Sequence, residues 1–214
     1  GVQRSKGRAR QSAAESSFNA WSKFYKQDEN SQNAIVSYYT KGALIALCMD
    51  LKIRQLSENA KSLHDVMRLL WSQYLQTGRG IGEYEIQQTI GRLLGTDIST
   101  YLDQLIYSRQ ELPLQEMLQS VSISLEFRVS TGAQDKGGKP ATDLPLSSMG
   151  AIVRETPTGV DIVSLSELSA AQLAGISAGD SLIAINGLRV SMKSYQQWLK
   201  TMAPESRHQL TVFR

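Results

Sequence analysis

The stretch VSYYTKGALIALCMDL, residues 36–51, puts two tyrosines, a lysine and a glycine directly before a helix that is apolar on nearly every side. A phenol held near developing negative charge can donate a hydrogen bond that stabilises a transition state. A helix N-terminus adds a dipole that also favours negative charge. Tyr38 and Tyr39 could instead pack against neighbouring elements, and their residue types alone leave both interpretations open.

Other residues with catalytic or metal chemistry are few. The two histidines, His64 and His208, lie far apart in the sequence, and neither has a partner at the spacing of metal ligands. Cys48 lies within the apolar helix, where burial makes a thiol inert. Ser62, His64 and Asp65 fan out around one helical turn, which is not the geometry of a catalytic triad. We therefore predict no metal site and no bound cofactor in the chain itself.

The composition is that of a globular protein with one large domain or two ordinary ones. The chain has 214 residues, of which 41% are apolar and 20% charged, and its net charge is +3. No run of about 18 apolar residues occurs, so we expect no membrane span. The single cysteine cannot form an internal disulfide, which favours a reducing, cytoplasmic location. Four basic residues crowd the first ten positions without an aromatic or helical reader, so nucleic acid is not an expected partner.

Proline divides the chain, because all five prolines lie at or after Pro113. The proline-free part shows the period of helices. Ser62, with Asp65 three residues later, has the pattern of a helix N-cap. The predicted helices lie near residues 13–27, 37–54, 62–75, 83–94, 98–108 and 114–119. Residues 1–119 are therefore expected to form an all-helical domain.

From residue 120 the apolar period changes to two. The run VSISLEFRV, residues 121–129, alternates as a half-buried strand does, and a long glycine- and serine-containing loop follows. Gly175 is placed to end a short helix, and Asn186–Gly187 predicts a hairpin turn. The other expected elements are strands near 150–155, 160–165, within 179–190 and at 208–214, and helices near 170–174 and 192–202. The sequence thus predicts an α+β protein with domains 1–119 and 120–214.

The run LSAAQLAGISAGDSLIAINGLRV, residues 168–190, resembles a PDZ domain of the type attached to bacterial proteases. This resemblance covers residues 120–214 and implies a small β-barrel with two helices. It also implies that an extended peptide adds a strand to the sheet edge beside a glycine-containing loop. The positions that match this groove are Met149, Gly150, Ala151 and Ile152 in the loop and strand, and Tyr195 and Leu199 on the facing helix. The last two, four residues apart on a helix, could equally belong to a core.

The stretches SSFNAWSKFYKQDENSQNAIVSYYTKGALIALCMDLKIR and SLHDVMRLLWSQY resemble the C-terminal part of the catalytic domain in the glycyl aminopeptidase family of zinc metallopeptidases. A terminal PDZ domain is also usual in that family, so the resemblance covers nearly the whole chain. Related aminopeptidase N-like enzymes carry Tyr-x-Lys-Gly at a helix start, here Tyr39-Thr40-Lys41-Gly42. The resemblance implies that Tyr39 is the catalytic tyrosine and donates a hydrogen bond to the oxyanion on the peptide carbonyl. Tyr38 is then expected to pack, and Lys41 to lie at the surface or behind the site.

The resemblance also implies a zinc ion, which these enzymes hold with an H-E-x-x-H motif and a downstream glutamate. The chain contains no such motif. We therefore expect it to be an inactive C-terminal part of a hydrolase, a metallopeptidase acting on peptides with small N-terminal residues. Expected partners are a peptide or protein substrate, a peptide tail in the PDZ groove, and a second copy that pairs through apolar surface exposed by truncation.

A different class of protein fits the same residues. The chain could be a non-catalytic adaptor in which the helices are a scaffold and the PDZ domain binds a peptide. The gene upstream of Gly1 discriminates the two: an H-E-x-x-H motif there favours the enzyme, and a nearby start codon without that motif favours the adaptor.

Overall fold

The computed structural model describes residues 2, 5–128, 137–139, 147–157 and 159–214. The chain divides into two compact units. The first comprises Gly1–Lys26 and Ala34–Glu126, and the second comprises Gln27–Asn33 and Phe127–Arg214. The short segment Gln27–Asn33, which the sequence analysis assigned to the helical domain, is thus part of the second unit.

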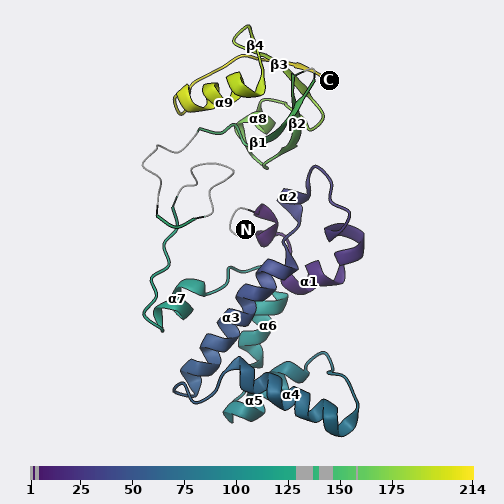
Figure 1. Cartoon of the computed structure of the whole chain (residues 1–214), viewed down its shortest axis with the longest axis vertical. Coiled ribbons are helices and arrows are strands. Elements are labelled where there is room, and N and C mark those ends of the chain that lie inside the picture. Colours follow the sequence, from purple (N-terminus) through teal and green to yellow (C-terminus); the bar gives the residue numbers. More distant parts are fainter. Residues whose placement is uncertain (1, 3–4, 129–136, 140–146, 158) are drawn as a thin grey trace. The chain divides into compact units, whose positions relative to one another are not determined.

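The first unit is built of helices around one long helix, α3 (Figure 1). The helical elements of the described chain up to residue 126 are η2 (Lys6–Ala9), α1 (Ala13–Phe18), η3 (Ala20–Phe24), α2 (Ser31–Ala34), α3 (Tyr38–Leu56), α4 (Leu63–Thr77), α5 (Glu85–Leu94), α6 (Ser99–Tyr107) and α7 (Leu114–Gln119). The helix expected over residues 13–27 is two short pieces, because a five-residue π-helix, η3, follows α1. The other predicted helices are present within two or three residues of their predicted bounds.

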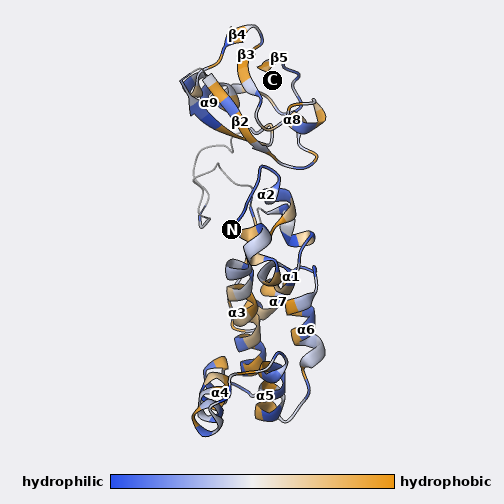
Figure 2. Cartoon of the chain, turned by 90° about the vertical axis from the view of Figure 1, so that its right-hand side faces the viewer, coloured by the Kyte–Doolittle hydropathy of each residue, from blue (hydrophilic) through white to orange (hydrophobic). Residues whose placement is uncertain are grey.

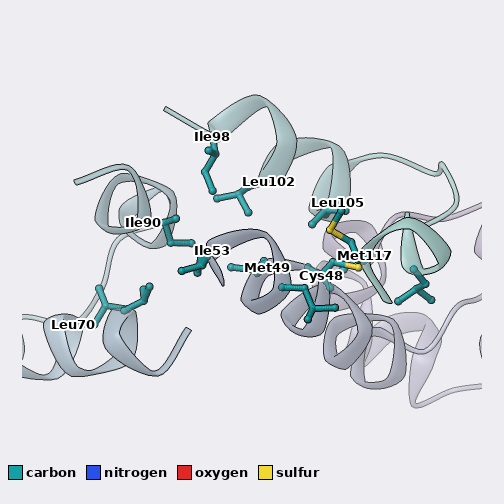
Figure 3. Packing of buried hydrophobic residues seen from close by; sticks show 14 residues of the cluster. Cys48, Met49, Ile53, Leu70, Ile90, Ile98, Leu102, Leu105 and Met117 are labelled. Carbon is teal, nitrogen blue, oxygen red and sulfur yellow. The ribbon is translucent and has the colours of Figure 1, made fainter. Parts of the chain in front are cut away.

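The core of the first unit forms on α3, which contacts α1, α4, α5, α6 and α7. Cys48 and Ile53 of α3 are fully buried, as are Ile90 of α5 and Leu102 of α6. Figure 3 shows Ile53, Ile90 and Leu102 pointing into the same space from three helices. Ser62 and Asp65 form the predicted reciprocal cap at the start of α4, which satisfies backbone donors that the helix itself cannot.

The stretch Ser31–Leu56 is long and apolar enough to cross a membrane by length and composition alone, which the sequence analysis had not expected. Figure 2 shows apolar residues along much of α3 and polar residues toward its C-terminal end. About a third of the apolar window, 33%, is buried inside the folded chain, and α3 supplies the central residues of the first core. A helix at the centre of a folded core meets the same criterion.

The strand predicted at residues 121–129 is wrong over 121–128, where the described chain is irregular. The Ile123 N–H donates to the Leu118 carbonyl at 3.0 Å, so the chain turns back on α7. Leu125 packs against the first core. The apolar alternation is present in the sequence, but no neighbouring strand pairs with this segment among the described residues. Val129 and most of the long loop after it lie outside the described residues.

From residue 127 onward, the described part of the chain contains an antiparallel sheet and the helices α8 and α9, so the chain as a whole is α+β. The strands pair in the order β1-β2-β3-β4. The edge of β3 that β2 and β4 leave free pairs with β5. The elements are β1 (Ala151–Thr156), β2 (Gly159–Leu165), α8 (Ala170–Leu173), β3 (Ser181–Ile185), β4 (Leu188–Arg189), α9 (Met192–Thr201) and β5 (Leu210–Phe213). The sheet formed by the described strands is open, so the predicted small β-barrel is not confirmed. Thr158, in the predicted turn between β1 and β2, lies outside the described residues.

The predicted Asn186–Gly187 hairpin turn is confirmed between β3 and β4. Asn186 has φ 51° and Gly187 has φ 77°, the left-handed pair that a two-residue hairpin turn requires. Ile185 and Leu188 face each other across the turn. Gly175, with φ 84°, follows α8 in the left-handed conformation that the sequence predicted.

The segment Gln27–Asn33 is fixed in the second unit by one buried side chain. Asn33 is 7% exposed. Its Nδ2 donates to the Leu165 carbonyl at 2.8 Å, and its Oδ1 accepts from the Glu167 N–H at 2.9 Å. Nδ2 also donates to Asn30 Oδ1 at 2.9 Å. The Asn33 amide therefore satisfies two backbone groups that lie more than 130 residues away in the sequence.

We predict that Asn33→Ala lowers the stability of the second unit by about 1–3 kcal/mol, because it removes the buried hydrogen bonds that the Asn33 amide makes to the Leu165 carbonyl and the Glu167 N–H. Amide hydrogen exchange in β2 and β3, measured by NMR, reports this loss as faster exchange. Asn30→Ala is the matched control, because Asn30 is exposed and its substitution leaves both backbone contacts in place. Unchanged protection of β2 and β3 in Asn33→Ala would contradict the prediction.

Candidate active site around Tyr39

Tyr39 lies in the first turn of α3, and the residue is 59% exposed. The Ser37 side chain caps this helix by accepting a hydrogen bond from the Thr40 N–H at 3.2 Å. The cap fixes where the helix begins, and with it the direction of the side chains of the first turn. Tyr39 therefore presents an accessible phenol at the positive end of a helix dipole.

The Tyr39 hydroxyl belongs to a group of three tyrosine hydroxyls. The Tyr25 hydroxyl oxygen lies 2.6 Å from that of Tyr39 and 2.9 Å from that of Tyr38. Tyr25 directly follows the π-helix η3, and its N–H donates to the Ala20 carbonyl at 2.9 Å. Irregular turns of this kind are frequent at functional sites. The sequence analysis placed Tyr25 only within the helix predicted near residues 13–27 and did not pair it with Tyr39.

The aromatic rings hold these hydroxyls together. The rings of Tyr38 and Tyr39 stack with centroids 4.2 Å apart. Phe24 packs edge-on against Tyr38 at 5.1 Å, and Trp21 lies 5.1 Å from Tyr25. Tyr38 thus packs as predicted, but its hydroxyl also takes part in the polar group. We call Trp21, Phe24, Tyr25, Tyr38 and Tyr39 the aromatic cluster.

The hydrogen bonds within the aromatic cluster shift the pKa values of Tyr38 and Tyr39 in opposite directions. The hydrogen bond with Tyr25 lowers the pKa of Tyr39 below its ordinary value near 10, and Tyr38 adds a smaller effect in the same direction. The hydrogen bond with Tyr25 also raises the pKa of Tyr38. Tyr39 is therefore the phenol of the pair that gives up its proton more readily.

The backbone just before α3 is held by polar side chains of the N-terminal segment. Val36 is fully buried. Its N–H donates to Gln11 Oε1 at 3.3 Å, and its carbonyl accepts from Ser16 Oγ at 2.6 Å. The Ile35 carbonyl accepts from Ser5 Oγ at 2.8 Å. These bonds satisfy backbone N–H and carbonyl groups of residues 35 and 36, which belong to neither a helix nor a strand.

Lys41, which the sequence placed at the surface or behind the site, is buried, with 2% of its surface exposed. Its ammonium nitrogen has no hydrogen-bond partner among the described residues. It lines a small cavity with Arg8 and Glu111, which form an ion pair at 2.7 Å. Burial lowers the pKa of Lys41, and the carboxylates of Glu111 and Glu15 only partly oppose this shift.

The described residues do not fit a zinc site. No group of three or more histidine, cysteine, aspartate or glutamate side chains lies together in the described ranges. His64 is exposed at the start of α4. Cys48 is fully buried, and burial raises the pKa of its thiol to about 11, so at neutral pH it stays a protonated thiol.

Both ring nitrogens of His208 lie within hydrogen-bond distance of polar groups in the second unit. Its Nδ1 accepts from Trp198 Nε1 at 3.3 Å and lies 3.0 Å from the amide nitrogen of Asn186. With two donors at Nδ1, the ring proton belongs on Nε2, which lies 2.7 Å from Ser206 Oγ. Ser206 in turn donates to the Ala203 carbonyl at 2.6 Å. In this arrangement the imidazole Nε2–H donates a hydrogen bond to the serine oxygen and cannot accept the serine proton, so His208 does not activate Ser206 as a nucleophile.

The six residues predicted to bind a peptide have different surroundings. Met149 and Tyr195 are 5% and 4% exposed and belong to the core of the second unit. Ala151 and Leu199 are half-buried against that core. Ile152 is 53% exposed on β1, the strand at one end of the pairing order. Their part in peptide binding stays a prediction.

Gly150 has a backbone that other residues could not adopt here. Its φ is 78°, and a Cβ at this position would lie 2.2 Å from Ser169 Cβ. The Gly150 carbonyl accepts from the Ser166 N–H at 2.8 Å. The entry of the chain into β1 therefore depends on a glycine at this position.

Known proteins that are similar to this chain are aminopeptidases, in agreement with the Tyr-x-Lys-Gly motif of the first unit. The model of the M61 glycyl aminopeptidase family matches residues 1–45, which include Tyr39 and the rest of the Tyr-x-Lys-Gly sequence. The crystal structure of an aminopeptidase N family protein from Idiomarina loihiensis is similar over 100% of this chain, with a TM-score of 0.88 and 36% sequence identity. The chain spans 36% of the length of that protein. No curated protein matches the chain.

Both matches point to one class of protein, the aminopeptidases. The family that they support is the M61 glycyl aminopeptidases, so the resemblance predicted from the sequence is confirmed, with the chain corresponding to part of such a protein.

The buried Lys41 gives a prediction about stability. Its folded pKa is lowered from an ordinary value of 10.5, so the unfolded chain binds more protons at intermediate pH, and stability rises as pH increases through that window. Lys41→Met should increase the free energy of unfolding at pH 7 by about 1 kcal/mol or more and remove this rise, because an unpaired buried charge is unfavourable.

Urea unfolding of the chain at pH 7 and above pH 9 measures both effects. The control is Lys61→Met, since Lys61 is exposed and its charge is solvated in both states. A lower stability of Lys41→Met at pH 7 would show that the ammonium makes a favourable interaction, and would reject this account.

Proposed function

We propose that the chain is part of an aminopeptidase and that Tyr39 acts in peptide hydrolysis. The observation that carries the proposal is the accessible phenol of Tyr39 at the N-terminus of α3, with its oxygen held on one side by Tyr25. The match of residues 1–45 to the M61 family supports it, because that range contains this tyrosine.

The proposed role of Tyr39 is electrostatic. When water attacks the carbonyl carbon of the scissile peptide bond, negative charge develops on the carbonyl oxygen. A neutral phenol donates a hydrogen bond to that oxygen, and the bond is stronger to the developing oxyanion than to the neutral carbonyl. The helix dipole favours the same charge. The carbon–nitrogen bond then breaks, the amine leaves with a proton that comes from the attacking water, the carbonyl carbon keeps the water oxygen as a carboxylic acid group, and the phenol keeps its own proton throughout.

The metal of such an enzyme is part of the proposal only for the intact protein. The described residues do not fit zinc, so its ligands would have to come from residues outside this chain, and we derive no step through the metal. Preference for peptides with a small N-terminal residue, such as glycine or alanine, is likewise proposed on the family resemblance. A reducing, cytoplasmic location is proposed on the single free, buried cysteine.

For the second unit we propose a PDZ-like role in peptide docking. The support is that β1 ends the pairing order of the described strands and carries the exposed Ile152, directly after the glycine-dependent turn at Gly150. An extended peptide could pair with such an edge. Met149 and Tyr195 would then shape the groove from the core, without direct contact with the peptide.

In the intact enzyme, Tyr39→Phe should lower kcat by about 100-fold or more and change KM little, because it removes a hydrogen bond that is strongest in the transition state. Steady-state kinetics on a peptide with an N-terminal glycine measures this. Tyr74→Phe is the matched control, since it removes an exposed phenol elsewhere on the helical unit. Turnover like that of the wild type would exclude Tyr39 from the mechanism.

The isolated chain should not form a stoichiometric zinc site, because its histidines and carboxylates do not converge in the described ranges. Isothermal titration of the purified chain with zinc tests this directly. One tightly bound zinc per chain that is lost on His64→Ala or His208→Ala would contradict the proposal that the ligands lie elsewhere.

A further inference from the structure

Tyr25 stands between the two other tyrosines of the aromatic cluster. Its hydroxyl oxygen lies within hydrogen-bond distance of both Tyr38, at 2.9 Å, and Tyr39, at 2.6 Å. Tyr25 comes from the end of η3, whereas the other two begin α3. Because the three tyrosines do not share a helix, their hydroxyls come together only in the folded chain.

The number of protons limits how these hydroxyls can bond. Each phenol has one proton and can accept at its oxygen. If Tyr39 donated to Tyr25, its proton would be used inside the aromatic cluster and could not reach a substrate. If Tyr25 donates to Tyr39 and accepts from Tyr38, the bonds run from Tyr38 through Tyr25 to Tyr39. Only this second direction leaves the Tyr39 proton free to leave the cluster.

We propose that Tyr25 is a positioning residue for Tyr39: its hydroxyl donates to the Tyr39 oxygen and thereby directs the Tyr39 proton outward, toward the carbonyl oxygen of the substrate. The proposal rests on the proposed function of Tyr39. It also assigns Tyr38 a part, as the donor that occupies the accepting side of Tyr25. A donor that is itself an acceptor is polarised, so each bond in the series strengthens the next.

The acidities of the phenols agree with this direction. A phenol that accepts hydrogen bonds has a stabilised anion and a lower pKa, and a phenol that donates its proton has a higher one. The pKa of Tyr39 is lowered and that of Tyr38 is raised, and in each case the hydrogen bond with Tyr25 is the largest cause. In the part of the chain that the structure describes, the titratable groups that alter the pKa of Tyr39 are Tyr25, from the end of η3, and Tyr38, from α3.

The rings fix Tyr25 for this task. Trp21 of η3 packs on the Tyr25 ring at 5.1 Å, and Phe24 packs on it nearly perpendicular at 5.5 Å. Phe24 also lies 5.9 Å from the Tyr39 ring. Because Tyr25 and Tyr39 are 49% and 59% exposed, water could solvate both hydroxyls if the rings did not bring them together. The ring contacts keep the Tyr25 and Tyr39 hydroxyls within hydrogen-bond distance of each other.

The first test uses the chain itself and does not depend on hydrolysis. Tyrosine labelled with ¹³C at the ring carbon that bears the hydroxyl reports each phenol's titration by NMR. In Tyr25→Phe, the pKa of Tyr39 should rise toward 10 and that of Tyr38 should fall toward 10. Tyr74→Phe, the control, should leave both unchanged. Unshifted titration of Tyr39 in Tyr25→Phe would overturn the proposal.

The second test uses the intact enzyme. Tyr25→Phe keeps the ring and should lower kcat by about 10-fold with little change in KM, less than Tyr39→Phe because the acting phenol is still present. In a Tyr39→Phe background, Tyr25→Phe should cause no further loss, since it acts through Tyr39. Equal additive losses in both backgrounds would show that Tyr25 acts independently and would overturn the positioning role.

The two proposals fail in different ways. If Tyr39→Phe leaves kcat unchanged, the proposed function fails whatever the titration shows. If Tyr39→Phe lowers kcat but Tyr25→Phe alters neither kcat nor the titration of Tyr39, the proposed function stands and the positioning role of Tyr25 is rejected.

Discussion

The entry of the chain into α3 depends on a buried, extended segment whose backbone is satisfied by side chains. Val36 has no exposed surface, and its N–H and carbonyl bond to Gln11 and Ser16. An unsatisfied backbone group in such a place costs about 1–3 kcal/mol, so the two side chains fix the segment strongly. Tyr38 and Tyr39 begin the next turn, and their position in the first unit follows from this constraint.

The two halves of the aromatic cluster are joined by a segment that belongs to the second unit. Tyr25 precedes Gln27–Asn33, and Tyr38 follows it; between them the chain leaves the first unit and returns to it. Asn33 holds this segment to the backbone of Leu165 and Glu167. These bonds hold Gln27–Asn33 within the second unit, although Tyr25 and Tyr38 on either side of it in the sequence belong to the first.

Local signals in the sequence predicted much of this fold, and contacts between distant residues explain what they missed. The helical period, the Ser62–Asp65 cap and the Asn186–Gly187 turn act within a few residues, and all three are confirmed. The alternation at 121–128 is also local, but a strand needs a partner that the pattern does not contain. The burial of Lys41 and the contacts of Asn33 depend on residues far away in the sequence, so type and spacing could not predict them.

The candidate site shows the same division between local motif and fold. Tyr39 could be found because Tyr-x-Lys-Gly is contiguous, whereas Tyr25 lies 14 residues away, directly after the π-helix η3, and its hydroxyl meets that of Tyr39 only in the folded chain. The sequence between Tyr25 and Tyr39 includes Gln27–Asn33, which belongs to the second unit, so no helical or strand periodicity relates the two tyrosines. A motif can thus identify the phenol that we propose to face a substrate, but the group that we propose to direct its proton is found only once the backbone is known. Since no metal-ligating cluster occurs among the described residues, the hydrogen bonds around Tyr39 are formed by the phenols themselves, and the acidity of Tyr39 can be measured in this chain separately from hydrolysis.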